Sequence, residues 1–264
     1  MLVNVGCTGW GYDGWQGPFY PKNLPRSDFL RHYSSIFDVT EVNSTFYAIP
    51  SDMMVKKWNS ETPNHFKFTA KLPQIITHDN RLANPSPHLE QFLQSMKFLG
   101  TKFLLSVVQL PPSLSFEEVR PKLEQLQSYF PENNYVIEGR HQSWFSDSAI
   151  RYLTDKKICL VWSDVAGIQN TAPLTSDFVY LRLIGDRTIQ EKDFGKLQKD
   201  RTAQMKSWIE KIQQIQDKIS YAVIMANNRY EGFGPVTANK LRLLLGMEGL
   251  SFADKRQKTL FGKP

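Results

Sequence analysis

Two glutamates stand at the ends of apolar strand-like runs, where their carboxyl groups could perform acid–base chemistry. Glu41 lies in the run 39–42, and Glu138 ends the run 135–138. Burial at such a position is expected to raise the pKa of a carboxyl group toward neutrality, which suits proton transfer. Asp164 follows the strand-like run 158–162 and is a third candidate catalytic carboxylate.

Ion pairing is the alternative role for the two glutamates, because networks of paired charges imitate active sites. The cations in question are Arg140 or Arg182 for Glu138, and Lys67 or Lys71 for Glu41.

Basic side chains near the same strand ends suggest an anion site. Lys71, Arg140 and Arg182 could clamp a phosphate or a carboxylate, and the planar guanidinium group suits contacts with two oxygens at once. A helix beginning within 227–234 could add backbone N–H donors. The candidate ligand-binding residues are Trp10, Asn43, Tyr47, Lys71, His78, Gln109, Arg140, His141, Trp144, Arg182, Asn227 and Asn228.

Aromatic residues among these candidates could stack on a ligand or enclose it, and Trp10, Tyr47 and Trp144 are the ones we expect to do so. For any single polar residue, the competing role is to satisfy the backbone groups of a loop. The gathering of so many polar strand ends, Thr8 among them, is therefore the functional signal.

Metal and cofactor motifs are missing from the sequence. The chain has five histidines but no H-x-H or H-E-x-x-H spacing, and no glycine-rich phosphate motif. Cys7 and Cys159 are too few for a thiolate metal site, and Cys7 is better suited to a buried apolar role than to a nucleophilic one. We predict no metal and no cofactor.

Eight strand-like runs must position these residues, and most of them are followed by a helix-like segment. The runs are 2–8, 39–42, 66–72, 103–110, 135–138, 158–162, 178–184 and 221–225. The longest expected helix spans 194–218, and the sixth run has no clear helix after it. Strands that alternate with helices predict a parallel sheet, and polar residues at the carboxyl ends of barrel strands indicate a site.

The predicted fold class is therefore α/β, a single TIM-like (β/α)8 barrel with a closed parallel sheet. A length of 264 residues suits one such barrel, so 1–264 is predicted to be one domain. The basic tail, 254–264, is expected to be loosely held.

Charge and hydropathy narrow the class of partner. Lys and Arg number 32 against 26 Asp and Glu, a net charge of +6, which suits an anionic ligand or a nucleic acid. No apolar run approaches the length of a membrane span, and the first residues do not resemble a signal peptide. We expect a cytoplasmic protein without a membrane partner.

Several segments, in a fixed order along the chain, resemble those of one known family. They are VGCTGWGYDGWQGPFYP, EVNSTFYAIPS, FTAKLPQIITH, QLPPS, VIEGRHQSWF, VWSD, VYLRLIGD and NNRYEGFGPVTANKL. Together they resemble the YecE-like family, group seventy-two among the domains of unknown function. The resemblance implies a TIM-like barrel but no activity. A likeness to metal-dependent phosphodiesterase barrels acting on DNA is a fold-level analogy.

The function predicted from these observations is an enzyme or binder of a small anionic ligand, phosphorylated or carboxylated, at the carboxyl-terminal face of the barrel. If it is an enzyme, acid–base chemistry by a strand-end glutamate is favoured. The alternative is a nucleic-acid binding or phosphodiester-processing protein that uses the same basic, aromatic-rich face. Substrate, reaction class and oligomeric state stay open.

Overall fold

The strands of the chain form one parallel sheet that closes into a barrel. The computed structural model describes residues 1–85, 87–130, 132 and 134–252. The strands are β1 (Leu2–Thr8), β2 (Val39–Val42), β3 (Lys67–Lys71), β4 (Phe103–Gln109), β5 (Tyr135–Glu138), β6 (Cys159–Leu160), β7 (Trp162–Val165), β8 (Phe178–Gly185) and β9 (Tyr221–Ala226).

Hydrogen bonding orders the sheet β6-β5-β4-β3-β2-β1-β9-β8-β7. Its two outermost strands, β6 and β7, are separated in the chain by Val161 alone, whose N–H donates to the carbonyl of Ile137 at 2.8 Å. The sixth predicted run is thus divided in two, and the ring is nearly closed. The predicted α/β barrel is confirmed.

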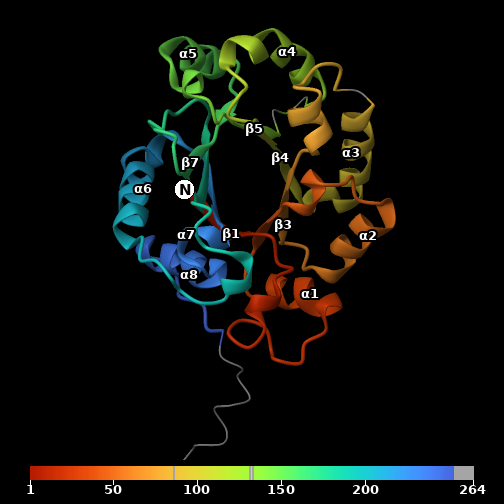
Figure 1. Cartoon of the computed structure of the whole chain (residues 1–264), viewed down its shortest axis with the longest axis vertical. Coiled ribbons are helices and arrows are strands. Elements are labelled where there is room, and N and C mark those ends of the chain that lie inside the picture. The colour runs from red at the N-terminus through yellow and green to blue at the C-terminus, as the bar shows by residue number, and fades with distance from the viewer. Residues whose placement is uncertain (86, 131, 133, 253–264) are drawn as a thin grey trace, which may run out of the picture.

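The helices surround the strands as an outer ring (Figure 1). They are α1 (Phe29–Ser34), α2 (Asp52–Glu61), α3 (His88–Met96), α4 (Phe116–Ser128), α5 (Asp147–Asp155), α6 (Thr202–Gln214), α7 (Asn228–Glu231) and α8 (Gly234–Leu244). Apolar side chains between this ring and the strands form the larger core of the molecule. No helix among the described residues is long and apolar enough to cross a membrane.

The expected helix 194–218 is wrong in its first third. Helix α6 begins at Thr202, and the preceding residues form a loop. Gly195 in this loop has φ +97, and a Cβ at that position would overlap the carbonyl of Gly14. The loop therefore needs a glycine where it packs against the first βα connection. The expected loose tail, 254–264, lies outside the described residues.

Strand alternation decides what fills the barrel, because successive side chains point to opposite faces. The inner positions form a second, apolar core: Val39, Leu105, Val107, Val136, Cys159, Val161, Phe178, Tyr180, Val223 and Met225. Two residues further along their strands, four of these positions are followed by polar groups. These are Glu41, Gln109, Glu138 and Arg182, and they line the barrel's carboxyl-terminal end.

Candidate functional site

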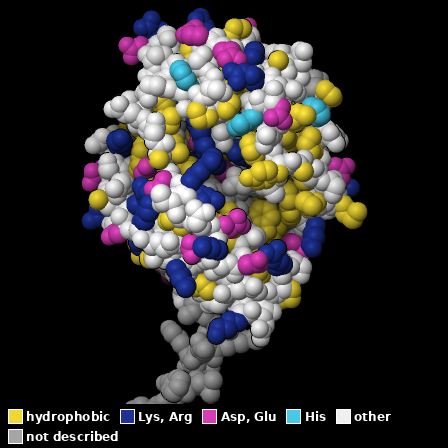
Figure 2. Space-filling model, viewed as in Figure 1, with side chains coloured by type: hydrophobic (Ala, Val, Ile, Leu, Met, Phe, Trp, Pro, Cys, Tyr) yellow, Lys and Arg dark blue, Asp and Glu magenta, His cyan; other side chains and the backbone are white. Residues whose placement is uncertain are grey.

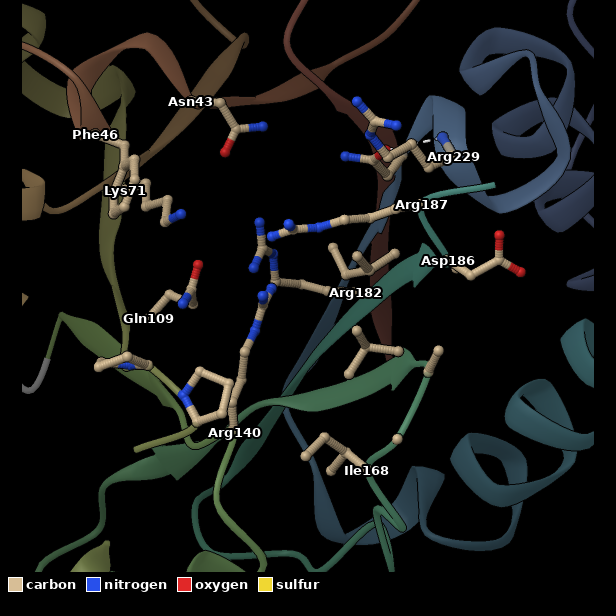
Figure 3. Close-up of a pocket in the computed structure, with 18 of the residues that line it drawn as sticks. Asn43, Phe46, Lys71, Gln109, Arg140, Ile168, Arg182, Asp186, Arg187 and Arg229 are labelled. Atoms are coloured by element: carbon tan, nitrogen blue, oxygen red, sulfur yellow. Dashed lines mark hydrogen bonds between the residues drawn. The ribbon is translucent and has the colours of Figure 1, made fainter. Parts of the chain in front are cut away.

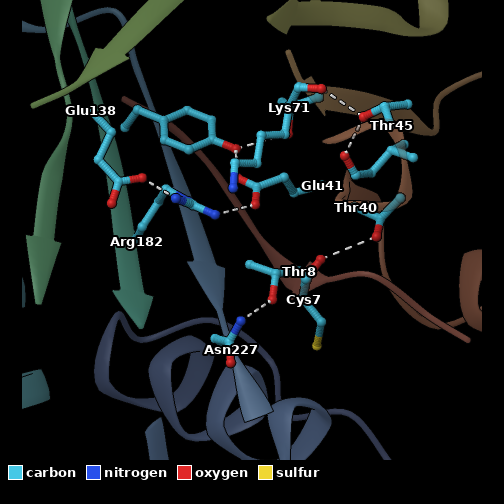
Figure 4. Close-up of polar contacts among 12 residues, drawn as sticks. Cys7, Thr8, Thr40, Glu41, Thr45, Lys71, Glu138, Arg182 and Asn227 are labelled. Atoms are coloured by element: carbon cyan, nitrogen blue, oxygen red, sulfur yellow. Dashed lines mark hydrogen bonds and ion pairs between the residues drawn. The ribbon is translucent and has the colours of Figure 1, made fainter. Parts of the chain in front are cut away.

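A buried charged layer closes the upper end of the barrel interior; we call Glu41, Glu138, Tyr180 and Arg182 the pocket floor. Arg182 Nη2 donates to Glu41 Oε1 at 2.6 Å, and Arg182 Nη1 pairs with Glu138 Oε2 (Figure 4). The hydroxyl of Tyr180 donates to Glu41 Oε2 at 2.8 Å. Both carboxylates are 0% exposed and Arg182 is 3% exposed. The floor is a hydrogen-bonded ion-pair network cut off from solvent.

The pairing overturns the expected behaviour of Glu138. Burial would raise the pKa of its carboxyl, but Arg140, Arg182 and Lys71 outweigh burial and lower that pKa to about 2. Arg140 Nε donates to Glu138 Oε1 at 2.9 Å. The prediction of a pKa near neutrality is therefore wrong for Glu138, whereas the alternative pairing with Arg140 and Arg182 is what the structure shows.

Glu41 is paired as well, but with a different cation from those expected. Its partners are Arg182 and Tyr180, from β8 on the far side of the barrel interior. Lys67 instead donates from Nζ to the carbonyl of Thr101 at 2.8 Å. Sequence proximity suggested the neighbouring lysines, whereas the barrel brings together residues 141 positions apart.

Above the floor lies an open pocket of about 1070 Å³ at the carboxyl-terminal ends of the strands. Lys and Arg side chains gather in this hollow near the centre of the face in Figure 2. Lys71, Arg140, Arg182 and Arg187 point toward a common space (Figure 3). The predicted residues that line it are Asn43, Tyr47, Lys71, His78, Gln109, Arg140, Arg182 and Asn227.

Lys71 ends β3 and reaches into the pocket. Its Nζ lies 3.5 Å from the centre of the Phe46 ring, and no hydrogen bond joins that nitrogen to a described residue. Burial, followed by the charge of Arg182, lowers the pKa of this amine to about 7; Arg140 acts in the same direction, whereas Glu138 and Glu41 oppose it. Near neutral pH, charged and neutral amines therefore coexist.

The opposite wall of the pocket is a tied-down loop that follows β8. Asp186 Oδ2 accepts hydrogen bonds from Lys199 Nζ and Arg201 Nη2, both at 2.8 Å, and Asp186 Oδ1 accepts from the N–H of Thr188 at 2.9 Å. These contacts, led by Lys199, hold the pKa of Asp186 well below its usual range. Arg187 is exposed and points into the pocket, and no side-chain hydrogen bond joins it to a described residue.

Several lining residues were not predicted from the sequence. They are Tyr12, Phe46, Gln74, Pro111, Pro112, Val165, Ala166, Gly167, Ile168, Ile184, Gly185, Asp186, Arg187, Glu191, Phe194 and Arg229. A signal existed for Arg187, because it ends the Gly-Asp-Arg segment directly after a strand. Arg229 follows the last strand by three residues, but its Nη1 donates to the carbonyl of Ile189 at 2.7 Å.

Asp164 lies on the outer face of β7, away from the pocket. Its Oδ2 accepts hydrogen bonds from Trp208 Nε1 at 3.0 Å and from the hydroxyl of Tyr230 at 2.8 Å. Both partners belong to the helix layer. The structure therefore places Asp164 on the outer face of the barrel wall, while Glu41 and Glu138 lie inside the barrel.

Four candidate ligand-binding residues also lie outside the pocket lining. Trp10 packs edge-on against Trp58, and His141 accepts a hydrogen bond from the N–H of Ser143 at 3.2 Å. Trp144 is buried and donates from Nε1 to the carbonyl of Leu114 at 3.0 Å. These groups serve loops and packing.

Asn228, the fourth, and its neighbour Asn227 satisfy the backbone that was expected to bind an anion. Asn227 Oδ1 accepts from the N–H of Arg229 at 2.9 Å, and Asn228 Oδ1 accepts from the N–H of Gly234 at 2.8 Å. Asn227 Nδ2 also donates to Thr8 Oγ1 at 2.8 Å (Figure 4). The expected donation of these two N–H groups to a ligand is thus replaced by side-chain capping.

Metal-binding side chains do not cluster in the part of the chain that the structure describes: it holds no group of three or more His, Cys, Asp or Glu residues placed to share an ion. Both cysteines are buried there, and burial raises the pKa of the Cys7 thiol far above its ordinary value. The thiol of Cys7 is therefore protonated at neutral pH.

Comparison with known proteins gives a consistent answer over nearly the whole chain. The profile of the family described as "Protein of unknown function DUF72" matches residues 4–260. UPF0759 protein YecE of Escherichia coli K12 is 31% identical over 145 residues, which are 55% of this chain and 51% of YecE. UPF0759 protein YunF of Bacillus subtilis is 29% identical over 153 residues, 55% of this chain and 53% of YunF. The chain thus spans about half the length of the curated relatives it matches.

Solved structures share the barrel. A DUF72 family protein of Thermotoga maritima superimposes with a TM-score of 0.79 at 24% identity, over 93% of this chain and all of that one. A DUF72 family protein of Enterococcus faecalis gives 0.75 at 19% identity, over 94% and 98% of the two chains. At these identities the likeness establishes the fold alone.

Proposed function

This chain belongs to the DUF72 family of proteins of unknown function, and from that premise we propose that its pocket binds a small ligand carrying a phosphate or a carboxylate, on which it acts as an enzyme. The observation that carries the proposal is the convergence of Lys71, Arg140, Arg182 and Arg187 on one space.

Charge balance supports an anion. Glu41 and Glu138 are matched by Arg182 and Arg140, so the floor and its immediate partner are close to neutral. Lys71 and Arg187 then remain above the floor, each without a hydrogen bond from its side chain to a described residue. A phosphate or carboxylate would accept charge-assisted hydrogen bonds from such groups.

We assign Glu41 and Glu138 to positioning Arg182 rather than to proton transfer. A carboxylate whose pKa lies near 2, as that of Glu138 does, is a weak base at neutral pH. Either glutamate would first have to leave its guanidinium partner before it could accept a proton.

The test is a thermal-shift series with inorganic phosphate, phosphorylated sugars and organic acids at constant ionic strength. A ligand at a hundred times its Kd stabilises the folded state by about 2.7 kcal/mol, so a clear rise in Tm is expected. Arg187→Gln should abolish most of that rise, because it removes a cation that points into the pocket. Arg151→Gln, on the exposed face of α5, is the matched control and should leave the shift intact. The proposal fails if every small anion leaves Tm unchanged, or if the two variants respond alike.

A nucleic acid is the second candidate, favoured by Tyr47. This side chain lies at the edge of the open pocket and is 82% exposed, as a base-stacking platform would be. Short DNA and RNA strands belong in the same series. A shift from these strands alone, lost steeply as salt rises and weakened by Tyr47→Ala, would replace the small anion with a nucleic acid.

A further inference from the structure

The amine of Lys71 differs from the other well-placed lysines of the molecule in having no acceptor. Lys102 donates to the carbonyls of Asn59 and Thr62, at 2.6 and 2.7 Å, and Lys199 donates to Asp186. Those amines hold elements together. Lys71 Nζ instead faces the pocket across the ring of Phe46 and is open to a ligand.

The groups around Lys71 come from every side of the barrel mouth. Arg182 from β8 and Arg140 from the β5 connection disfavour the charged amine, as does burial, while Glu138 and Glu41 favour it. His78, on the π-helical turn Ile75–Asp79, contacts the same Phe46 ring with 5.0 Å between ring centres. The balance leaves the pKa of Lys71 at about 7, so a large fraction of the amine is neutral and nucleophilic near neutral pH.

We propose that Lys71 forms an imine with an aldehyde or ketone that carries a phosphate or carboxylate group, held by Arg140 and Arg187. The inference rests on the proposed anion-binding function, and it deepens that function by naming the substrate class as acidic carbonyl compounds.

The chemistry balances with groups at hand. The neutral amine adds to the carbonyl carbon, and the carbonyl oxygen takes up a proton to give a carbinolamine. The carbinolamine loses water, and a C=N bond replaces the C=O bond. The lowered pKa of His78, caused by burial and by the charges of Lys71 and Arg140, lets its imidazole accept and return the proton. The protonated imine then withdraws electrons from the adjacent carbon, which is how covalent amine catalysis eases bond cleavage beside a carbonyl.

The experiment is reductive trapping. The protein is incubated with glyoxylate, pyruvate or glycolaldehyde phosphate together with sodium cyanoborohydride, which delivers a hydride to the imine carbon and fixes the adduct as a secondary amine. Intact mass and peptide mapping then locate it. We expect one adduct per chain, on Lys71, at least about tenfold faster than on any other lysine, in line with its larger neutral fraction.

Two variants make the result decisive. Lys71→Arg keeps the positive charge but removes the nucleophile, so trapping should disappear while the phosphate-induced thermal shift remains. Lys206→Arg, on the exposed face of α6, is the matched control and should trap as wild type does. Both variants should keep the wild-type Tm in the absence of ligand.

The pH profile adds an independent readout with glyoxylate, whose own charge is constant across the range. Between pH 6 and pH 8 the neutral fraction of an amine with a pKa of about 7 rises about tenfold and levels off, whereas that of an ordinary lysine rises about a hundredfold without levelling.

The outcomes separate the two proposals. Adducts spread over many lysines, or undiminished in Lys71→Arg, overturn the imine. An anion-induced shift without trapping overturns the imine and leaves the anion site standing. Neither shift nor trapping overturns both.

Discussion

The floor of the pocket and the residues above it carry the same kinds of charge but are organised differently. In the floor, every carboxylate oxygen of Glu41 and Glu138 faces a donor from Arg182, Arg140 or Tyr180, out of contact with solvent. Above it, Lys71 and Arg187 reach the pocket without hydrogen-bond acceptors among the described residues. The difference teaches that a charge at a strand end contributes to stability when it is paired and is available to a ligand when it is not.

The strongest way to break this comparison is to remove the cation at the centre of the floor. Arg182→Met leaves two buried carboxylates without their shared partner, and breaking a buried ion pair in this way costs about 3–5 kcal/mol. We expect the free energy of unfolding in urea to fall by that amount. A loss below about 1 kcal/mol, the range of exposed pairs, would show that the floor is not a buried network.

Acid should weaken the floor by a somewhat smaller amount. The pKa of Glu138 is about 2 in the folded chain and 4.5 for an unperturbed glutamate, so its pairing stabilises the protein fully above pH 4.5. That stability, roughly 3 kcal/mol, is lost as pH falls from 4.5 toward 2.

The measurement is the free energy of unfolding between pH 6 and pH 3, compared with Glu138→Gln. The variant should show a flatter decline with acid because it has no carboxylate to protonate at that position. Parallel curves would mean that Glu138 is not the group responsible.

The smallest effect concerns the outer face of the barrel. Asp164→Ala removes the acceptor for Trp208 Nε1 and the Tyr230 hydroxyl and should cost about 1–3 kcal/mol of stability. Ligand-induced thermal shifts should be unchanged, because the carboxylate faces the helix layer. Asp155→Ala, an exposed position in α5, is the matched control for the stability measurement. Loss of the ligand shift in Asp164→Ala alone would move Asp164 to the functional side of the comparison.

The fold was predictable because eight apolar runs at the right spacing leave few alternatives to a barrel. Lys71 was also predictable: Phe66, Phe68 and Ala70 alternate with Lys67, Thr69 and Lys71, and this period of two assigns opposite faces.

Asp164 was misplaced because Leu160, Val161 and Trp162 are apolar on both sides of their strand. The run that leads to Asp164 therefore has no visible inner and outer face, and only the packing of Trp208 and Tyr230 distinguishes them. The lowered pKa of Glu138 depends on Arg182, 44 residues further on, and local sequence cannot report a pairing over that distance.

The loop that carries Arg187 has a kinetic consequence. Asp186 anchors it through Lys199, Arg201 and Thr188, and the backbone of Gly185, at φ +75, packs where a Cβ would overlap Arg229. The wall of the pocket is therefore ordered before a ligand arrives, and binding loses little conformational entropy there. We expect association to be governed by diffusion and by attraction to the cations, so that added salt slows capture while leaving the shape of the pocket unchanged.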